Sequence, residues 1–231
     1  MHLDLTGKIG LLAAALLLCA NARAGTLDLG SASGTQANVG VKSWQQMRFA
    51  ATIRQQYDFS CGSAALATLL TYHYNFPVSE AAVFEAMFRA GDQQTIRRQG
   101  FSLLDMQVYL RSQGFQGDGF ELPLEKLAAA KLPAIVLVSD QGYNHFVVLK
   151  GIADGRVLLG DPANGARAVS LARFHELWRN KLLFVIHGHS GAITFNGGPD
   201  WRSAPTVPLG QALDTAALAA AFLPKFGPGD F

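Results

Sequence analysis

Cys61 is the residue whose type and setting most strongly suggest chemistry. It opens an apolar stretch that runs to Leu70, and Ser60 stands before it where a helix N-cap is expected. The first turn of a helix carries a partial positive charge, which favours the reactive thiolate form of a cysteine. Gly62 would leave room for a substrate backbone beside the sulfur. The pattern predicts a nucleophilic cysteine, and a buried structural cysteine is the alternative.

A cysteine nucleophile needs a base, and a distant segment offers one. His145 opens a β-rich run over 145–152, where we expect its imidazole at a sheet edge. Asp161 follows the next β-rich run, 156–160. Two antiparallel strands joined at 153–155 would bring this carboxylate back to the imidazole, which it would orient and stabilise when charged. The order of cysteine, histidine and aspartate along the chain is that of papain-like enzymes.

The tetrahedral intermediate of acyl transfer also needs hydrogen-bond donors for its oxyanion. Gln55 lies six residues before Cys61 and can supply a side-chain amide, with the backbone N–H of Cys61 as the second donor. Gln56 competes for this role, but the six-residue offset favours Gln55. Asp58 is interpreted as a turn and cap residue outside the catalytic set.

The elements that must position these residues change character along the chain. Helical patterns come first, and a capping-box signature of Ser102 and Asp105 marks one of their starts. Short β-rich runs separated by Gly, Asp and Asn turns follow. This order predicts an α+β fold with a mainly antiparallel sheet. The predicted helices cover 61–72, 79–90, 102–114 and 122–130, and the predicted strands cover 133–138, 145–152, 156–160 and 182–187.

The first 24 residues are typical of an export signal. Lys8 precedes a short apolar run over 9–20, and Ala-Arg-Ala at 22–24 is a small-x-small cleavage site. Cleavage there removes Cys19 and leaves Cys61 as the single thiol of an exported protein. The remaining organisation is predicted as a flexible lead-in over 25–43, a catalytic domain over 44–190, and a Pro/Gly-rich extension over 191–231 with one short helix at 210–223.

Composition excludes several classes of protein. The chain has 231 residues, of which 49% are hydrophobic and 16% charged, with a formal net charge of +2. It is too apolar to be a disordered tail. Its net charge is near zero and its Lys and Arg residues are scattered, which argues against nucleic acid as the main ligand. No apolar run approaches the roughly 20 residues of a membrane-spanning helix. The sequence contains no phosphate-binding loop, so nothing in it indicates a nucleotide ligand. His187-x-His189 could place two imidazoles on one strand face, but the sequence suggests no third ligand to complete a metal site.

Three spaced motifs resemble the peptidase C39 family: QQYDFSCGSAAL from Gln55, HFVVL from His145 and DPANG from Asp161. The resemblance covers roughly 52–186 and implies a papain-like fold. It also implies cleavage after a double-glycine motif, with Cys61 as nucleophile, His145 as base, Asp161 as orienting carboxylate and Gln55 as oxyanion donor. Many members have Asp directly before the cysteine, whereas this chain has Ser60.

As a stand-alone, exported protein, this chain resembles the C39-type proteases of a bacterial functional-amyloid secretion system. The sequence therefore predicts a periplasmic cysteine endopeptidase without cofactor or metal. The resemblance implies a polypeptide substrate cut after small residues, either amyloid subunits or outer-membrane export components, and no nucleic acid or nucleotide. One alternative is a catalytically silent cargo-binding module of an export system. Another is a cell-wall hydrolase with the same order of cysteine and histidine.

Overall fold

The computed structural model describes residues 26–29, 37–40, 43–140 and 142–204. The predicted signal at 1–24 and the predicted helix at 210–223 lie outside the described residues. The chain divides into a unit over 1–46 and a larger one over 47–231. In the first, β1 (Thr26–Leu29) pairs antiparallel with β2 (Ala37–Gly40) inside the segment predicted as a lead-in without regular elements. Four-residue strands are too short for a recognisable alternation of apolar and polar residues.

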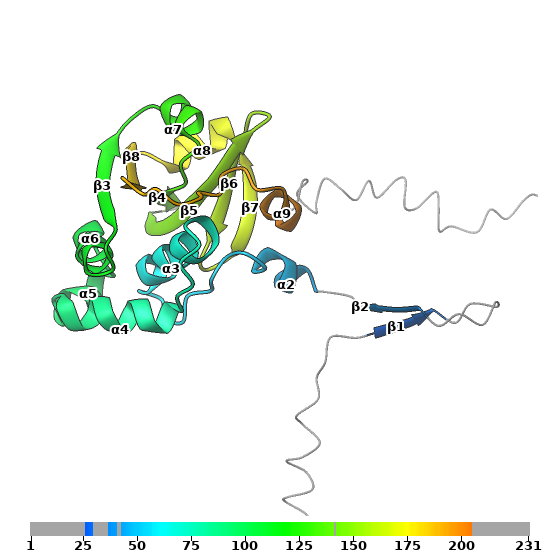
Figure 1. Cartoon of the computed structure of the whole chain (residues 1–231), viewed down its shortest axis with the longest axis horizontal. Helices are drawn as coiled ribbons and strands as arrows, with labels where there is room; N and C mark the ends of the chain where they lie inside the picture. The colour runs from blue at the N-terminus through cyan, green and yellow to red at the C-terminus, as the bar shows by residue number, and fades with distance from the viewer. Residues whose placement is uncertain (1–25, 30–36, 41–42, 141, 205–231) are drawn as a thin grey trace, which may run out of the picture. The chain divides into compact units, whose positions relative to one another are not determined.

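The larger unit is built on a six-stranded sheet in which every described pair is antiparallel (Figure 1). The strand order is β3-β8-β4-β5-β6-β7, so the predicted antiparallel sheet is confirmed. The strands are β3 (Gln116–Glu121), β4 (Ala134–Asp140), β5 (Tyr143–Ala153), β6 (Arg156–Asp161), β7 (Gly165–Ser170) and β8 (Leu182–His187). β5 is an internal strand, but His145 pairs with β4 alone, because the pairing of β5 with β6 begins at Val148. The histidine therefore lies at the margin of the sheet, as expected.

Helices cover both faces of this sheet (Figure 1). One hydrophobic core lies under the first helices, which include the cysteine-bearing α3, and the second core lies under α7 and α8. On the first face are α3 (Cys61–His73), α4 (Glu80–Ala90), α5 (Gln93–Gln99) and α6 (Leu103–Ser112). On the other are α7 (Leu124–Ala130) and α8 (Leu171–Leu177). A short helix α2 (Trp44–Arg48) precedes them. This arrangement confirms the predicted α+β class.

Side-chain caps start several of these helices. Ser79 accepts a hydrogen bond from the backbone N–H of Ala82, and Ser102 with Asp105 forms the predicted capping box. Ser60 does not act as predicted. It stands before α3 but makes no side-chain cap, because its backbone (φ −98°, ψ 15°) is not extended. Its hydroxyl instead bonds the backbone of Tyr57 and shapes the loop that leads into α3.

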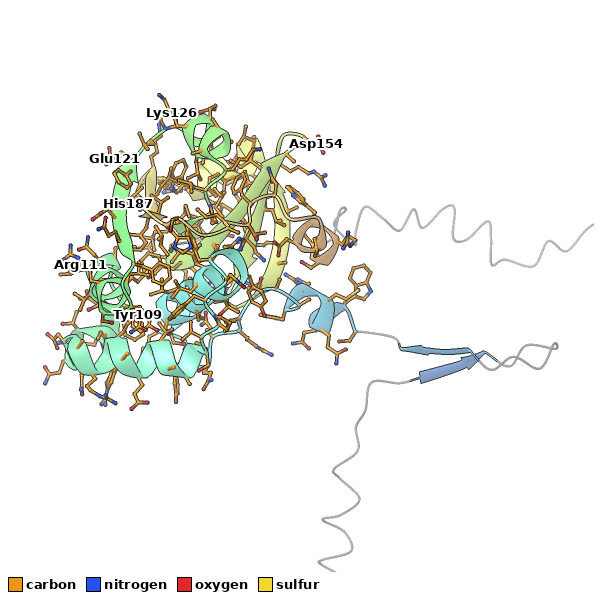
Figure 2. All side chains as sticks on the ribbon, in the orientation of Figure 1. Tyr109, Arg111, Glu121, Lys126, Asp154 and His187 are labelled. Carbon is orange, nitrogen blue, oxygen red and sulfur yellow. The ribbon has the colours of Figure 1, made fainter. Side chains whose placement is uncertain are left out.

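β5 and β6 form a tight hairpin that carries two of the candidate site residues. Ala153 pairs with Arg156, so only Asp154 and Gly155 lie in the turn. Both have positive φ, 51° and 67°, as a two-residue turn of type I′ requires. Figure 2 places Asp154 at the tip of this turn. Farther along the hairpin the pairing register skips Lys150, which gives β5 an irregularity at that residue.

The described residues from 194 to 204 pack against α3 and the sheet. Thr194 donates its backbone N–H to the backbone oxygen of His73 at the end of α3, and Asn196 donates its own to the backbone oxygen of Lys150 on β5. The helix α9 (Gly198–Ser203) then contacts β7, and Ala204 is buried. The first part of the predicted extension is therefore packed onto the larger unit. None of the described helices is long and apolar enough to span a bilayer.

Candidate active site

Cys61 is the first residue of α3 and is a free thiol with 8% of its surface exposed. Its backbone N–H belongs to the first turn, where such groups have no partner within the helix. Gly62 does not provide space for a substrate, contrary to the sequence prediction. A Cβ there would lie 2.9 Å from Met106 Cε and 3.0 Å from Phe101 Cβ. The glycine instead allows α3 to begin in close contact with α6.

His145 and Asp161 lie together on the β5–β6 hairpin, as predicted. His145 Nε2 is 2.8 Å from Asp161 Oδ1, and both side chains are buried. Asp161 ends β6 and starts a tight turn, in which its Oδ1 also accepts from the backbone N–H groups of Ala163 and Asn164. Its Oδ2 accepts from the Asn164 side chain. The carboxylate is therefore fixed by its own turn before it orients the imidazole.

The environment of the pair favours its charged form. Burial lowers the pKa of His145, but hydrogen bonds to Asp161 and Cys61 and the charges of both groups outweigh burial and raise it from 6.5 to about 9. Burial likewise raises the pKa of Asp161, but the hydrogen bond and charge of His145, followed by the charge of Arg167, lower it from 3.8 to about 2. At neutral pH the site therefore holds an imidazolium and a carboxylate.

The second ring nitrogen of His145 is the one left for the thiol. Its Nδ1 is buried and has no conventional hydrogen-bond partner among the described residues. Cys61 is nevertheless near enough to raise the pKa of the imidazole. The structure therefore brings together a thiol at a helix start, an imidazole beside it and a carboxylate behind the imidazole. This combination of groups can perform acyl transfer through a covalent thioester.

Gln55 lies beside these groups, but its amide is engaged with the loop. Its Nε2 donates to the Tyr57 oxygen at 3.0 Å and lies 3.5 Å from the Asp58 oxygen. Its backbone N–H donates to the Pro162 oxygen at 3.0 Å, which joins the Gln55 segment to the turn after Asp161. The structure thus places Gln55 at the site without aiming its amide at an open position. The competing Gln56 is exposed.

Tyr143 is a site residue that sequence reasoning missed. Its ring stacks on the His145 ring with centroids 5.9 Å apart, and its hydroxyl donates to the Asp58 oxygen at 3.2 Å. It therefore links the strand that carries the imidazole to the loop that precedes the thiol. The only signal in the sequence was an aromatic residue two positions before the histidine.

The other histidine motif is divided between two environments. His187 Nε2 contacts Asp118 Oδ2 at 2.5 Å across the β8–β3 pair, and Figure 2 shows His187 on the outer part of the sheet. The His189 ring stacks on Phe115 and lies edge-on to Tyr74. Within the described part of the chain, no group of three His, Cys, Asp or Glu side chains could hold a metal ion.

Comparisons with known proteins point in one direction. A family model described as the peptidase C39 family matches residues 50–190. Two relatives named probable functional amyloid protease FapD are similar over 148 residues, at 42% identity in Pseudomonas aeruginosa and 40% in Pseudomonas fluorescens. Each alignment covers 64% of this chain and 65% of the relative, so the chain spans just under two thirds of their length.

A solved structure supports the same fold. The peptidase domain of Streptococcus ComA, described as a bi-functional ABC transporter involved in quorum sensing, superposes with a TM-score of 0.50 at 22% identity. The match covers 59% of this chain and 96% of that domain. The larger unit therefore has the papain-like fold of C39 peptidase domains, as predicted.

Proposed function

Since this chain belongs to the peptidase C39 family, we propose that it is an exported cysteine endopeptidase with Cys61 as nucleophile. One observation carries the proposal, namely the placement of this thiol at a helix start beside the buried pair of His145 and Asp161. The proposed substrate is a protein of a functional-amyloid system, in line with the names of the FapD relatives. Amyloid subunits and outer-membrane export components are the candidates.

The proposed reaction begins with attack by the Cys61 thiolate on the scissile carbonyl, which forms a C–S bond. The backbone N–H of Cys61 and the side-chain amide of Gln55 stabilise the oxyanion. For this, Gln55 must exchange its longer contact, with the Asp58 oxygen, for the substrate oxygen. The His145 imidazolium then gives its Nδ1 proton to the leaving amine as the C–N bond breaks.

Hydrolysis of the thioester reverses these proton movements. Water attacks the acyl carbon and gives a proton to Nδ1 of His145, and the C–S bond breaks to release the carboxylic acid and the thiolate. Asp161 remains ionised throughout and keeps the Nε2–H of the imidazole on its Oδ1. This residue therefore orients the base and stabilises its charged form in both halves of the reaction.

We propose cleavage after small residues of the Gly-Gly type. One exposed aromatic ring, that of Tyr143, stacks on the imidazole of His145 with centroids 5.9 Å apart. A bulky side chain next to the scissile bond would have to fit beside this ring, whereas glycine has no side chain to place there. Family membership supports the same specificity.

The test uses the purified chain under reducing conditions with a Cys61→Ala control. Amyloid subunits, export components and peptides containing Gly-Gly are incubated with each protein, and the products are identified by mass spectrometry. We expect cleavage after Gly-Gly by the wild type alone. If none of these substrates is cut, the proposed endopeptidase activity is wrong. Substrate binding and secretion that survive Cys61→Ala would favour a cargo-binding module. Release of muropeptides from purified sacculi would favour a cell-wall hydrolase.

Export to the periplasm is part of the same proposal. It rests on the signal predicted at 1–24, with a mature chain that starts at Gly25. Cell fractionation followed by N-terminal sequencing tests it directly. Recovery of a chain that keeps Met1 in the cytoplasmic fraction would contradict it.

A further inference from the structure

Lys150 is a buried lysine outside the candidate catalytic set. Its side chain is 0% exposed, and its ammonium forms an ion pair with Asp200 on α9. An ammonium without a partner is strongly disfavoured in the protein interior, and burial lowers the pKa of Lys150 while the charge of Asp200 opposes that shift. Its long side chain also crosses β6 at Gly160, where a Cβ would lie 3.0 Å from Lys150 Cδ.

The groups around Lys150 leave Asp200 as its one charged partner among the described residues. The Tyr72 ring lies 5.8 Å from its ammonium. The neighbouring His73 bonds the Thr194 oxygen through Nδ1, and burial, followed by the charge of Lys150, lowers the pKa of His73 to about 4. This histidine is therefore neutral at pH 7.

Lys150 also reaches the segment that carries Gln55. Its Nζ donates to the backbone oxygen of Ala51 at 2.7 Å. Two residues on, the Ile53 N–H donates to the Thr68 hydroxyl of α3 at 2.9 Å. Two residues farther, the Gln55 N–H donates to the Pro162 oxygen at 3.0 Å. The segment over 51–55 is thus tied at alternate residues to β5, to the nucleophile helix and to the turn after Asp161.

The partner of Lys150 comes from a segment beyond the family match. That match ends at residue 190, whereas Asp200 lies on α9. The approach to α9 is fixed on β5 by Asn196, which donates its backbone N–H to the Lys150 oxygen at 3.0 Å and its side-chain amide to the Ile152 oxygen at 2.9 Å. Gly151 permits this contact, since a Cβ there would lie 3.1 Å from Asn196 Cα.

We propose that Lys150, charge-balanced by Asp200, is a positioning residue that sets the place of Gln55 relative to Cys61. Lys150 touches no reacting atom; it acts through the Ala51 oxygen and the tied segment. The segment over 194–200 is then part of the working peptidase and not an appendage to it. This inference rests on the proposed function, because Gln55 matters only if an oxyanion forms.

The test separates thiol reactivity from peptide hydrolysis. Alkylation of Cys61 by iodoacetamide forms no oxyanion, whereas acylation by a fluorogenic Gly-Gly amide does. The variant K150M/D200L removes both charges together, a change that often preserves or raises stability. We expect its denaturant midpoint to stay near that of wild type and the rate of Cys61 alkylation to stay within about twofold. The rate of acylation should fall about tenfold or more, because loss of one oxyanion donor lowers rates by about 10²–10³-fold.

A double-mutant cycle with Gln55→Ala identifies the route of the effect. If Lys150 acts through Gln55, K150M/D200L causes little further loss in the Gln55→Ala background. Fully additive losses, or wild-type acylation by K150M/D200L, would overturn the inference. If that variant does not fold, K150M/D200N, which is neutral and closer in shape, replaces it in the same cycle.

Failure of the proposed function has a different signature. A wild-type chain that does not react with the Gly-Gly amide or any Gly-Gly protein, although its thiol is alkylated, would overturn the endopeptidase and this inference with it. A wild-type chain that reacts and depends on Gln55, but not on Lys150, would overturn this inference alone.

Discussion

Two histidine–aspartate pairs in this chain share their chemistry and nearly share their geometry, but only one lies beside Cys61. The nitrogen–oxygen distance is 2.8 Å for His145 and Asp161, and 2.5 Å for His187 and Asp118. The side chains of the first pair are 8% and 1% exposed, whereas those of the second are 37% and 43% exposed. The contrast isolates what burial and a neighbouring thiol add to an imidazole–carboxylate contact.

The difference teaches that the hydrogen bond alone does not prepare a histidine for catalysis. In the exposed pair, the hydrogen bond from His187 lowers the pKa of Asp118, but water competes for both groups. In the buried pair, low polarity strengthens each charge–charge contact, and the turn after Asp161 fixes the carboxylate. The imidazole is therefore held in one orientation with its charge stabilised at neutral pH.

The largest expected effect comes from removing the two imidazoles in turn. His145→Ala should lower kcat/KM for a Gly-Gly peptide by about 10⁴-fold, because the proposed proton donor to the leaving amine is lost. The matched His187→Ala variant should stay within about twofold of wild type. Steady-state kinetics on the two proteins, with circular dichroism to verify folding, makes the comparison. Equal losses would mean that the two pairs do not differ in function.

A smaller loss is expected from Asp161→Asn. The new amide nitrogen must face the imidazole, the turn N–H groups or the Asn164 side chain, all of which donate to the carboxylate in the wild type. We expect kcat/KM to fall about 10²–10³-fold, within the range of acid–base contributions. Asp118→Asn is the control and should leave the same peptide kinetics unchanged. Wild-type rates in Asp161→Asn would contradict the orienting role.

The pH profile should distinguish the buried pair by its alkaline limb. Because the pKa of His145 is raised to about 9, kcat/KM should fall about tenfold per pH unit above that value, as the acid for the leaving amine is lost. The raised pKa also adds stability that is fully present below pH 6.5 and is lost as the pH rises through about 9. Rates and denaturant unfolding measured from pH 6 to 10 test both. In Asp161→Asn the limb should move to lower pH, and an unmoved limb would exclude Asp161 as its cause.

The smallest expected change in kcat/KM comes from altering the aromatic residue that packs on each histidine. Tyr143 stacks on His145 and donates to Asp58, whereas Phe120 meets His187 edge-on. Tyr143→Phe keeps the ring and removes one hydrogen bond, so we expect kcat/KM to fall about threefold. Phe120→Leu is the control and should have no effect on the same kinetics. A loss of the same size in both variants would point to general destabilisation.

Local signals in the sequence were sufficient for much of the fold. The apolar period and the caps predicted α4 and α6, and the bounds of β8 were predicted over 182–187. The polar strand β3 and the small-residue strand β7 were not predicted, because their segments QGDGFE and GARAVS lack a clear alternation. Helices α5 and α8, of seven residues each, are too short to show a helical period.

At the candidate site, the sequence predicted which groups would meet but not how each is held. The two strands and the short turn between them were enough to predict Asp161 beside His145, because a two-residue turn fixes the pairing register of the strands that it joins. The surroundings of Gly62, the engaged amide of Gln55 and the buried charge of Lys150 depend on segments far apart in the chain. No local pattern encodes contacts of this kind.

The tight turn between β5 and β6 also sets the order in which the site assembles. His145 and Asp161 are 16 residues apart, and a hairpin of this length closes within about 1–10 μs, so the base and its orienting carboxylate can meet early in folding. The nucleophile joins only when α3 docks onto β5 from an earlier part of the chain. Peptide hydrolysis thus reports the packing of α3 against this hairpin, and denaturation that separates the two is expected to abolish the activity of the thiol.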